Sequence, residues 1–198
     1  MISLIQRYNF WGLLSLVNNL MITKLFFPRA KLIRSPFYIR GIAFIEIGKN
    51  FIAGVGLRMD AFPDKEKICI RIGDNVQIND YVHIGAVDSL TIGNNVLIAS
   101  RVFISDHNHG FYGNSSEQSI PEVPPAKRKL SFASVCIEDN VWIGEGVGIL
   151  PGVRIGKGSI IGCGAIVTRD VPECCLAVGN PARVIKKYSF KTKKWENI

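Results

Sequence analysis

Aliphatic residues recur at every sixth position through most of this chain, and that period restricts the fold more than any other feature of the sequence. An α-helix repeats every 3.6 residues and an isolated β-strand every 2, so neither explains a period of six. Short repeats of fixed length are typical of solenoids, in which each repeat packs only on its neighbours. The longest run keeps its phase over six repeats, at Ile137, Ile143, Ile149, Ile155, Ile161 and Val167.

A second run has the same period but shifts by two residues close to Asp88. Its members are Ile72, Ile78 and Ile84, then Ile92, Ile98 and Ile104. Each hexapeptide predicts a short strand with its aliphatic side chain inward, then a turn at Gly, Asn or Asp, which tolerate unusual backbone angles. Three strands close one triangular coil, and stacked coils pair in parallel around an aliphatic column. We therefore expect an all-β fold, a parallel β-helix over residues 45–187.

The longest departure from the period is the segment 105–134, which is rich in Pro, Ser and Gly. A stretch of about thirty residues without secondary structure of its own is uncommon in a compact domain unless it is functional, so we expect a loop extruded from the coil. His107 and His109 lie at its root, and His83 lies in an earlier repeat, on the outer face. Imidazole is the side chain best suited to proton transfer near neutral pH, which makes these histidines candidate bases. A shorter departure, residues 60–67, predicts only a hairpin or a bulging loop.

The N-terminal segment, residues 1–44, is apolar and basic and does not follow the period. Asn residues interrupt its apolar stretch, whereas spanning a bilayer takes ~20 mostly apolar residues. No small-residue cleavage site follows, so a secretory signal is not expected. A helix on a surface is predicted by the spacing of Leu13, Leu16, Val17, Leu20 and Met21. Two alternatives remain open for this helix: membrane contact through residues 1–40, or packing on its own domain or on a sister subunit.

Charge is concentrated at the two ends of the chain. The net charge is +8, yet residues 1–45 hold six basic and no acidic residues, residues 183–198 hold six basic and one acidic, and the middle is net acidic. A nucleic-acid binder usually carries its basic residues on the recognition element, so no nucleic-acid partner is expected. Basic ends suit an anionic membrane surface or an anionic cofactor. Five cysteines without paired or zinc-type spacing favour a reduced, cytoplasmic compartment.

The hexapeptide runs, the histidines of SDHNHG and the GNPA turn at residues 179–182 together resemble the left-handed β-helix of the hexapeptide-repeat acyltransferases. The likeness is to the galactoside and maltose O-acetyltransferase branch, and more closely to the acetyltransferases of surface polysaccharide assembly. It implies a left-handed coil, a short closing helix after the GNPA turn and a homotrimer with active sites between subunits. Residues 188–198 are expected to form a basic tail.

The activity that this resemblance implies is acetyl transfer from acetyl-CoA, as co-substrate, to a carbohydrate acceptor. The acceptor would be a sugar hydroxyl of an O-antigen, a capsule or its lipid-linked precursor, and the transfer would be direct, without a metal. In the family the base is a histidine five residues after the last inward aliphatic residue, and counting from Ile104 gives His109. His107 stays an alternative, and Asp106 is placed to orient either imidazole.

The resemblance also implies roles for residues outside that loop. Asn79 matches an acceptor-binding position with a part in catalysis, His83 lies near the acceptor, and Trp142 forms a wall of the site. A backbone N–H after Gly144 would stabilise the oxyanion. Coenzyme A carries phosphates that require cations and backbone donors. The cofactor contacts that the resemblance implies are Trp142, Gly144, Glu145, Gly162, Thr168, Arg169, Arg183 and Lys186.

Three other readings remain. A zinc hydratase of the γ-carbonic anhydrase type shares the fold and uses three histidines, but its paired ligands are five residues apart, whereas His107 and His109 are two apart. That mismatch argues against zinc. Transfer to an amino sugar, giving an N-acetyl product, would use the same base and cofactor. A purely structural β-helix protein is the third alternative, and affinity for coenzyme A would distinguish it.

Overall fold

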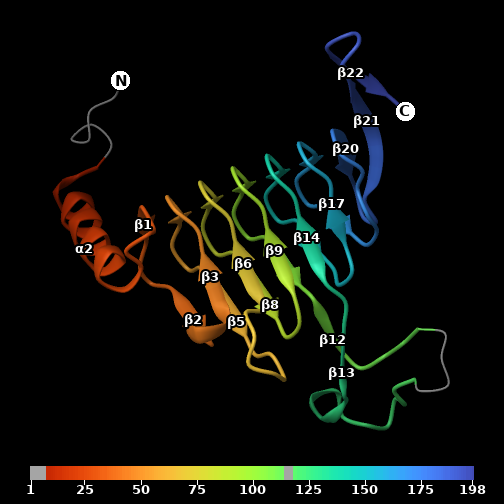
Figure 1. Cartoon of the computed structure of the whole chain (residues 1–198), viewed down its shortest axis with the longest axis horizontal. Coiled ribbons are helices and arrows are strands. Elements are labelled where there is room, and N and C mark those ends of the chain that lie inside the picture. The colour runs from red at the N-terminus through yellow and green to blue at the C-terminus, as the bar shows by residue number, and fades with distance from the viewer. Residues whose placement is uncertain (1–7, 114–117) are drawn as a thin grey trace.

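The computed structural model describes residues 8–113 and 118–198, and these form a stack of triangular coils with an N-terminal helix and a C-terminal extension (Figure 1). Each of the first five coils contributes one short strand to each of three sheets, and the later coils add strands to sheets A and B. The first, sheet A, consists of β1 (Leu32–Ile33), β4 (Ile52–Ala53), β7 (Gln77–Ile78), β10 (Leu97–Ile98), β15 (Trp142–Ile143), β18 (Ile160–Ile161) and β20 (Cys175–Val178).

The other two sides of the stack follow the same order along the chain. Sheet B consists of β2 (Tyr38–Arg40), β5 (Arg58–Ala61), β8 (His83–Ala86), β11 (Phe103–Ser105), β16 (Gly148–Ile149) and β19 (Ile166–Val167). Sheet C consists of β3 (Ile45–Ile47), β6 (Ile70–Ile72), β9 (Leu90–Ile92), β14 (Val135–Ile137) and β17 (Arg154–Ile155). The parallel β-helix predicted from the six-residue period is therefore present.

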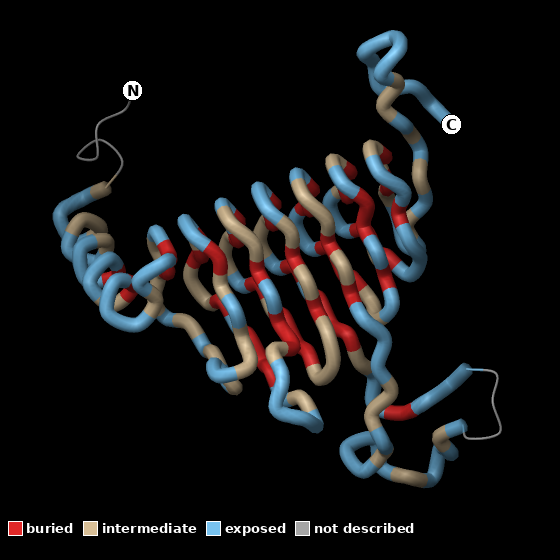
Figure 2. The backbone as a smooth tube through the Cα atoms, viewed as in Figure 1, coloured by how far each residue is buried: buried red, intermediate tan, exposed pale blue. Residues whose placement is uncertain are grey.

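The core is a column of aliphatic side chains in register from coil to coil. In sheet A, Ile78 pairs with Ile98, Ile98 with Ile143 and Ile143 with Ile161, and all four are buried. Figure 2 shows the buried positions repeating along the inside of the stack. Stacking identical short strands is how hexapeptides that cannot bury a core alone obtain one.

The turns between sheets C and A explain why asparagine recurs in the sequence. Asn75, Asn95 and Asn140 adopt φ of 58°, 56° and 59°, in the left-handed region where asparagine is tolerated. The side-chain amide of Asn75 donates to Asn95 at 3.1 Å, so the turns of neighbouring coils also bond to one another.

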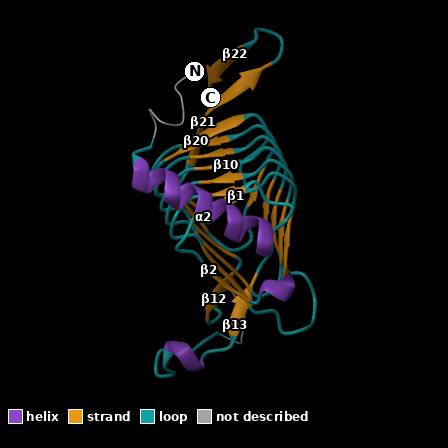
Figure 3. Ribbon diagram, turned by 90° about the vertical axis from the view of Figure 1, so that its left-hand side faces the viewer, coloured by secondary structure: helices purple, strands orange, loops and turns teal. Residues whose placement is uncertain are grey.

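The coil begins at β1, earlier than residue 45, because residues 32–44 supply the strands of the first coil in sheets A and B. Before it lies α2 (Phe10–Phe26), which starts after the cap Asn9, whose side chain accepts from the Gly12 N–H at 2.8 Å. The helix lies across the N-terminal end of the stack (Figure 3). Within the described residues, no helix has the length and apolar character needed to cross a bilayer.

The predicted closing helix at the C-terminus is wrong. After the GNPA turn the chain forms β21 (Arg183–Ser189), antiparallel to β20, and then β22 (Lys194–Asn197), so the expected tail 188–198 belongs largely to a hairpin. The physical reason is a period of two: exposure alternates along β21, as a strand with one packed face requires. Tyr188 adds an edge-on contact with Trp195 across the hairpin, with ring centroids 5.5 Å apart.

The insertions within the run of hexapeptides lie at one edge of the prism, between sheets B and C, which we call the insertion edge. Residues 62–69 leave between β5 and β6, the two-residue shift lies between β8 and β9, and residues 106–134 leave between β11 and β14. The long loop contains an antiparallel pair, β12 (His107–His109) with β13 (Leu130–Phe132). It projects from the stack in Figure 1.

Candidate active site

A cavity of about 460 Å³ opens on the outer face of sheet B, next to the insertion edge. His83, His107 and His109, which are all the histidines of the chain, line it. The remaining lining residues are Arg40, Arg58, Asp60, Phe62, Gly85, Ala86, Val87, Phe103, Ser105 and Leu130. The cavity therefore draws on four successive coils and on each departure from the repeat.

Strand register explains how residues far apart in sequence meet here. Arg58, His83 and Phe103 are Cα partners in neighbouring coils, and so are Arg40, Asp60, Gly85 and Ser105. Successive side chains of a strand point to opposite faces, and the intervening Met59, Ile84 and Ile104 are buried in the core. The two columns of partners therefore face outward, into the cavity.

Asp106 holds the imidazole of His107. The His107 Nδ1 lies 2.9 Å from Asp106 Oδ1, and the carboxylate, which is fully buried, also accepts the backbone N–H groups of Val87, Asp88 and Ser89 at 2.8–3.1 Å. Burial opposes ionisation, but the hydrogen bonds from His107 and the three amides outweigh it and lower the pKa of the Asp106 carboxyl. An Nδ1–H donated to this carboxylate leaves Nε2 as the nitrogen with a free lone pair.

His109 stands beside this pair on the same strand. Its ring centroid lies 6.4 Å from that of His107, and its backbone carbonyl accepts the Tyr112 hydroxyl at 2.5 Å. The side chain is exposed, and among residues 8–113 and 118–198 it forms no hydrogen bond. Arg128 supports this part of the loop, since its Nη1 donates to the Tyr112 hydroxyl at 2.7 Å and its Nε to the Val123 carbonyl at 2.8 Å.

A second carboxylate, Asp60, gathers three cationic or titratable groups. Its Oδ1 accepts Arg40 Nε at 2.6 Å, and its Oδ2 accepts Arg58 Nε at 2.7 Å and lies 3.1 Å from His83 Nε2. The hydrogen bond from Arg40 is the largest of several effects that lower the pKa of Asp60 to about 2, against the cost of burial. Asp60 is therefore ionised across the neutral pH range.

The other residues implied for the acceptor and the cofactor lie elsewhere. Trp142 lies on β15 of sheet A, Asn79 follows β7, and Gly144 and Glu145 follow β15 on the way to sheet B; none of the four lines the histidine cavity. Trp142 is half exposed, and the Glu145 carboxylate accepts Arg101 Nη1 at 2.6 Å. Within a single chain, these four positions therefore lie outside the cavity that the histidines line.

The remaining cofactor candidates follow the later strands of the stack. Thr168 and Arg169 are exposed after β19, and Arg183 and Lys186 lie on β21. Gly162 has a packing reason, because a Cβ there would stand 2.7 Å from Val178 Cγ1. These residues also lie outside the histidine cavity.

Sequence reasoning missed a group of cavity residues: Arg40, Arg58, Asp60, Phe62, Ser105 and Leu130. A signal was available, because counting strands in threes assigns residues 60–67 and 105–134 to the same edge of the prism. The short departure is therefore part of the cavity wall and more than a surface bulge. Across residues 8–113 and 118–198, no group of three His, Cys, Asp or Glu side chains is arranged to hold a metal ion.

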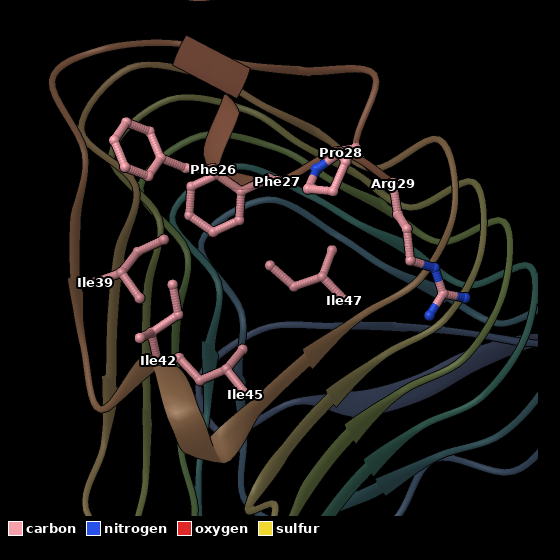
Figure 4. A pocket seen from close by; sticks show the side chains of 9 residues that line it. Phe26, Phe27, Pro28, Arg29, Ile39, Ile42, Ile45 and Ile47 are labelled. Atoms are coloured by element: carbon pink, nitrogen blue, oxygen red, sulfur yellow. The ribbon is translucent and has the colours of Figure 1, made fainter. Parts of the chain in front are cut away.

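A further hollow, of about 220 Å³, lies where the end of α2 meets the first coil (Figure 4). Phe26, Phe27, Ile39, Ile42 and Ile47 surround it, and Arg29 points away from it. Its walls carry no group suited to proton transfer. It is an apolar opening at the end of the prism.

Comparison with known proteins agrees with this architecture. Residues 137–169 match the family model described as "Bacterial transferase hexapeptide (six repeats)". The chain is 45% identical over 195 residues, 98% of each chain, to the Escherichia coli K12 protein named "Putative lipopolysaccharide biosynthesis O-acetyl transferase WbbJ".

Two solved structures are similar. A galactoside acetyltransferase in complex with coenzyme A is 33% identical with a TM-score of 0.52, covering 72% of this chain and 68% of that one. AntD, an N-acyltransferase from Bacillus cereus in complex with dTDP-4-amino-4,6-dideoxyglucose and coenzyme A, is 24% identical with a TM-score of 0.56, covering 87% and 90%; that likeness concerns the fold alone. Hexapeptide-repeat neighbours of this kind imply that the prism is left-handed.

Proposed function

We propose that this chain, which belongs to the hexapeptide-repeat acetyltransferase family, acetylates a sugar hydroxyl of a lipopolysaccharide O-antigen or a related surface glycan. Membership makes it an acyltransferase, and the coenzyme A bound to a galactoside acetyltransferase of similar fold supports acetyl-CoA as the co-substrate. The observation that carries the acceptor site is the cavity in which three histidines meet, one of them fixed by a buried carboxylate.

The proposed reaction is direct transfer. The base takes the proton of the acceptor hydroxyl on its unprotonated ring nitrogen while the hydroxyl oxygen forms a bond to the thioester carbonyl carbon. The carbonyl oxygen of the resulting tetrahedral intermediate is an oxyanion, which needs donors such as the backbone N–H after Gly144. The intermediate then re-forms its carbonyl as the carbon–sulfur bond breaks, and the coenzyme A thiolate takes the proton from the imidazolium. No covalent enzyme intermediate forms.

His109 is the proposed base, and His107 the group beside it. The family resemblance favours His109, and its imidazole is exposed to the cavity and bound to nothing in the described chain. The Nδ1 atom of His107 is already hydrogen-bonded to Asp106, and this bond fixes the ring plane and the tautomer of His107. His107 is therefore suited to bind the acceptor hydroxyl or to polarise the imidazole of His109.

A homotrimer would complete the site. Trp142 lies on β15 of sheet A and Gly144 directly after it, whereas the histidines lie on the outer face of sheet B toward the insertion edge. We propose that the histidine cavity of one chain meets the Trp142 edge of a neighbour, with coenzyme A in the groove between them. Closed cyclic symmetry is the usual way in which identical chains share such a heterologous contact.

The helix α2 supports a location at the inner face of a membrane. It turns polar residues inward: Asn19 and Thr23 are buried, with Asn19 Oδ1 accepting from Ser35 N at 2.9 Å and Thr23 Oγ1 from Ile33 N at 2.8 Å. Large apolar side chains face outward, namely Phe10, Trp11, Leu14, Val17, Met21, Leu25 and Phe26. Since residues 1–45 carry six basic and no acidic residues, we propose that this face rests on anionic lipid, near a lipid-linked acceptor.

An acceptor assay tests the activity. Purified protein is incubated with acetyl-CoA and surface-glycan oligosaccharides, simple glycosides or amino sugars, and release of the coenzyme A thiol is followed. We expect acceptor-dependent release and an acetyl group that neutral hydroxylamine removes, because hydroxylamine cleaves esters and leaves amides. A product stable to hydroxylamine would assign the enzyme to amino acceptors, and release that no acceptor increases would contradict transfer.

A further inference from the structure

The cavity holds, next to its histidines, a pair of arginines arranged as an anion site. Arg40 and Arg58 lie on neighbouring strands, and both donate Nε to the same carboxylate, Asp60, at 2.6 and 2.7 Å. Within the described chain, the Nη atoms of Arg40 and Arg58 donate no hydrogen bond. Each guanidinium therefore keeps a pair of donors for a ligand.

The positions of the two guanidinium groups are fixed by neighbouring side chains. The Asp60 side chain is only 11% exposed and is shared by the two arginines and His83, so it fixes both guanidinium planes. The Arg40 guanidinium also lies over the Phe62 ring, 5.3 Å from its centroid. Fixed guanidinium groups lose little side-chain freedom on binding, and they match carboxylate and phosphate oxygens with two parallel hydrogen bonds.

The charge of this end of the cavity is positive. Asp60 is the one carboxylate among the lining residues, all of which lie in the described part of the chain, and two arginines face it. One positive charge remains at this end even when every histidine is neutral, because the other carboxylate, Asp106, lies at the opposite end behind His107. The Arg40 and Arg58 side chains are 56% and 49% exposed, so water solvates this charge beside a neutral acceptor, whereas an anionic acceptor gains charge-assisted hydrogen bonds.

The distance to the reactive end suits one sugar unit. Arg58 lies on β5 and His107 follows β11, two coils further on, and neighbouring strands are about 5 Å apart, which gives about 10 Å. Gly85 leaves the space between them open, since a Cβ there would stand 3.5 Å from His107 Cε1 and 3.9 Å from His83 Nε2. A bound sugar can thus present a hydroxyl to the histidines and a charged substituent to the arginines.

We infer that the acceptor of this enzyme is anionic, and that Arg40 and Arg58 bind its carboxylate or phosphate group while the histidines receive the hydroxyl to be acetylated. The inference rests on the proposed function and narrows its substrate class. The same chemistry has two sources: the carboxylate of an acidic sugar, or the phosphate of a sugar joined to a diphosphate. The experiment separates them.

The test compares three acceptors built on one sugar: a neutral methyl glycoside, the corresponding uronate, and a nucleoside diphosphate derivative. The wild-type protein is compared with the double variant Arg40→Gln, Arg58→Gln. The control is Arg71→Gln, because Arg71 is an exposed arginine of sheet C that is paired with Glu46 and lies outside the cavity. Binding is measured calorimetrically for each acceptor and for coenzyme A, alongside kcat and KM.

We expect the wild type to prefer one anionic acceptor over the neutral glycoside by at least tenfold in kcat/KM. The double variant should reduce that preference about 10–100-fold, mainly through KM, as loss of charge-assisted bidentate bonds predicts. The control should keep it. Preference for the uronate identifies an acidic sugar, and preference for the diphosphate identifies a phosphorylated acceptor.

Other outcomes overturn the inference and leave the function standing. Equal use of neutral and charged acceptors, unchanged in the double variant, would do so. Weaker coenzyme A binding in the double variant would assign the arginines to the cofactor instead. If no acceptor is acetylated, the proposed function fails, yet calorimetric binding of an anionic acceptor that the double variant loses would still support the anion site.

Discussion

At the scale of single residues, two buried aspartates organise the cavity. Asp60 and Asp106 come from outward-facing stretches of the chain, and each is kept ionised by several donors. The sequence allowed His107, His109 and Asp106 to be identified because they stand at the root of a non-repeating segment, and His83 because it is the one other histidine of the chain. The sequence did not reveal Asp60. The six-residue period predicts whether a side chain points inward or outward, but it does not predict which residue of the next coil lies beside that side chain.

We predict that Asp60→Asn lowers the free energy of unfolding by about 1.5–3 kcal/mol at pH 7, the range for hydrogen bonds to charged groups. The pKa of Asp60 in the folded chain, about 2, lies below its usual value, so its contribution is full above about pH 4 and is lost as the pH falls through about 2. Urea unfolding of both proteins between pH 7 and 2.5 measures this.

Asp64→Asn serves as the control, because Asp64 is exposed in the same segment and should change stability little at any pH. Equal stability of wild type and Asp60→Asn at pH 7 would contradict the role given to this carboxylate.

We predict that His109→Ala lowers acetyl transfer by about 10²–10⁴-fold, the usual contribution of a general base, while coenzyme A affinity and the melting temperature stay near wild type. His107→Ala should lower kcat less. Steady-state kinetics with one acceptor and a coenzyme A titration separate the two effects. Near-normal turnover by His109→Ala, together with inactivity of His107→Ala, would transfer the role of base to His107.

At the scale of elements, the hexapeptide period predicted the strands well and the two ends of the chain less well. The N-terminal helix was expected from its spacing, but its orientation was not. Asn residues such as Asn19 were interpreted as interruptions of an apolar stretch, whereas Asn19 and Thr23 bind the backbone N–H groups of Ser35 and Ile33, at and just after β1. The expected C-terminal helix is a strand pair instead. The helix was expected from the family resemblance alone, whereas the alternating pattern of RVIKKYS has the period of two that is typical of a strand.

We predict that the double variant Leu14→Gln, Met21→Gln binds vesicles of anionic phospholipid at least tenfold more weakly than wild type. Both side chains are exposed on the outward face of α2, and burial of a large apolar side chain contributes about 1.5–3 kcal/mol. Sedimentation with vesicles measures the effect, and thermal unfolding should be unchanged. Vesicle binding equal to wild type, with a loss of oligomer in analytical ultracentrifugation, would show that the face packs on another chain.

At the scale of the whole molecule, the prism was predictable because one rule is applied coil after coil, whereas the proposed shared active site was predictable only as two separate groups of residues. The period assigns Trp142 and Gly144 to sheet A and its following turn and the histidines to sheet B and the insertion edge, and within one described chain these groups do not line a common cavity. Their union would depend on how copies associate, which is encoded in surface complementarity and not in the repeat.

We predict that mixing two impaired chains restores activity. His109→Ala removes the proposed base, and Trp142→Ala removes the opposite wall. In a trimer that contains both variants, some sites would combine His109 from the Trp142→Ala chain with Trp142 from the His109→Ala chain. The two variants are refolded together, and their acetyl transfer is compared with that of each variant alone. Activity no higher than the average of the separate variants would indicate that each site is built within one chain.

The ends of the prism also have a consequence for its solubility. Sheets B and C finish at β19 and β17, whereas sheet A alone runs on through β21, which is antiparallel to β20, and β22, which is antiparallel to β21. The final strand is short, exposed and begins with Lys194, the kind of edge that discourages pairing with another molecule. With α2 laid across the opposite end, neither end of the described prism presents a complete triangular template, which disfavours end-to-end stacking of molecules into a fibre although every rung within the prism resembles the one before.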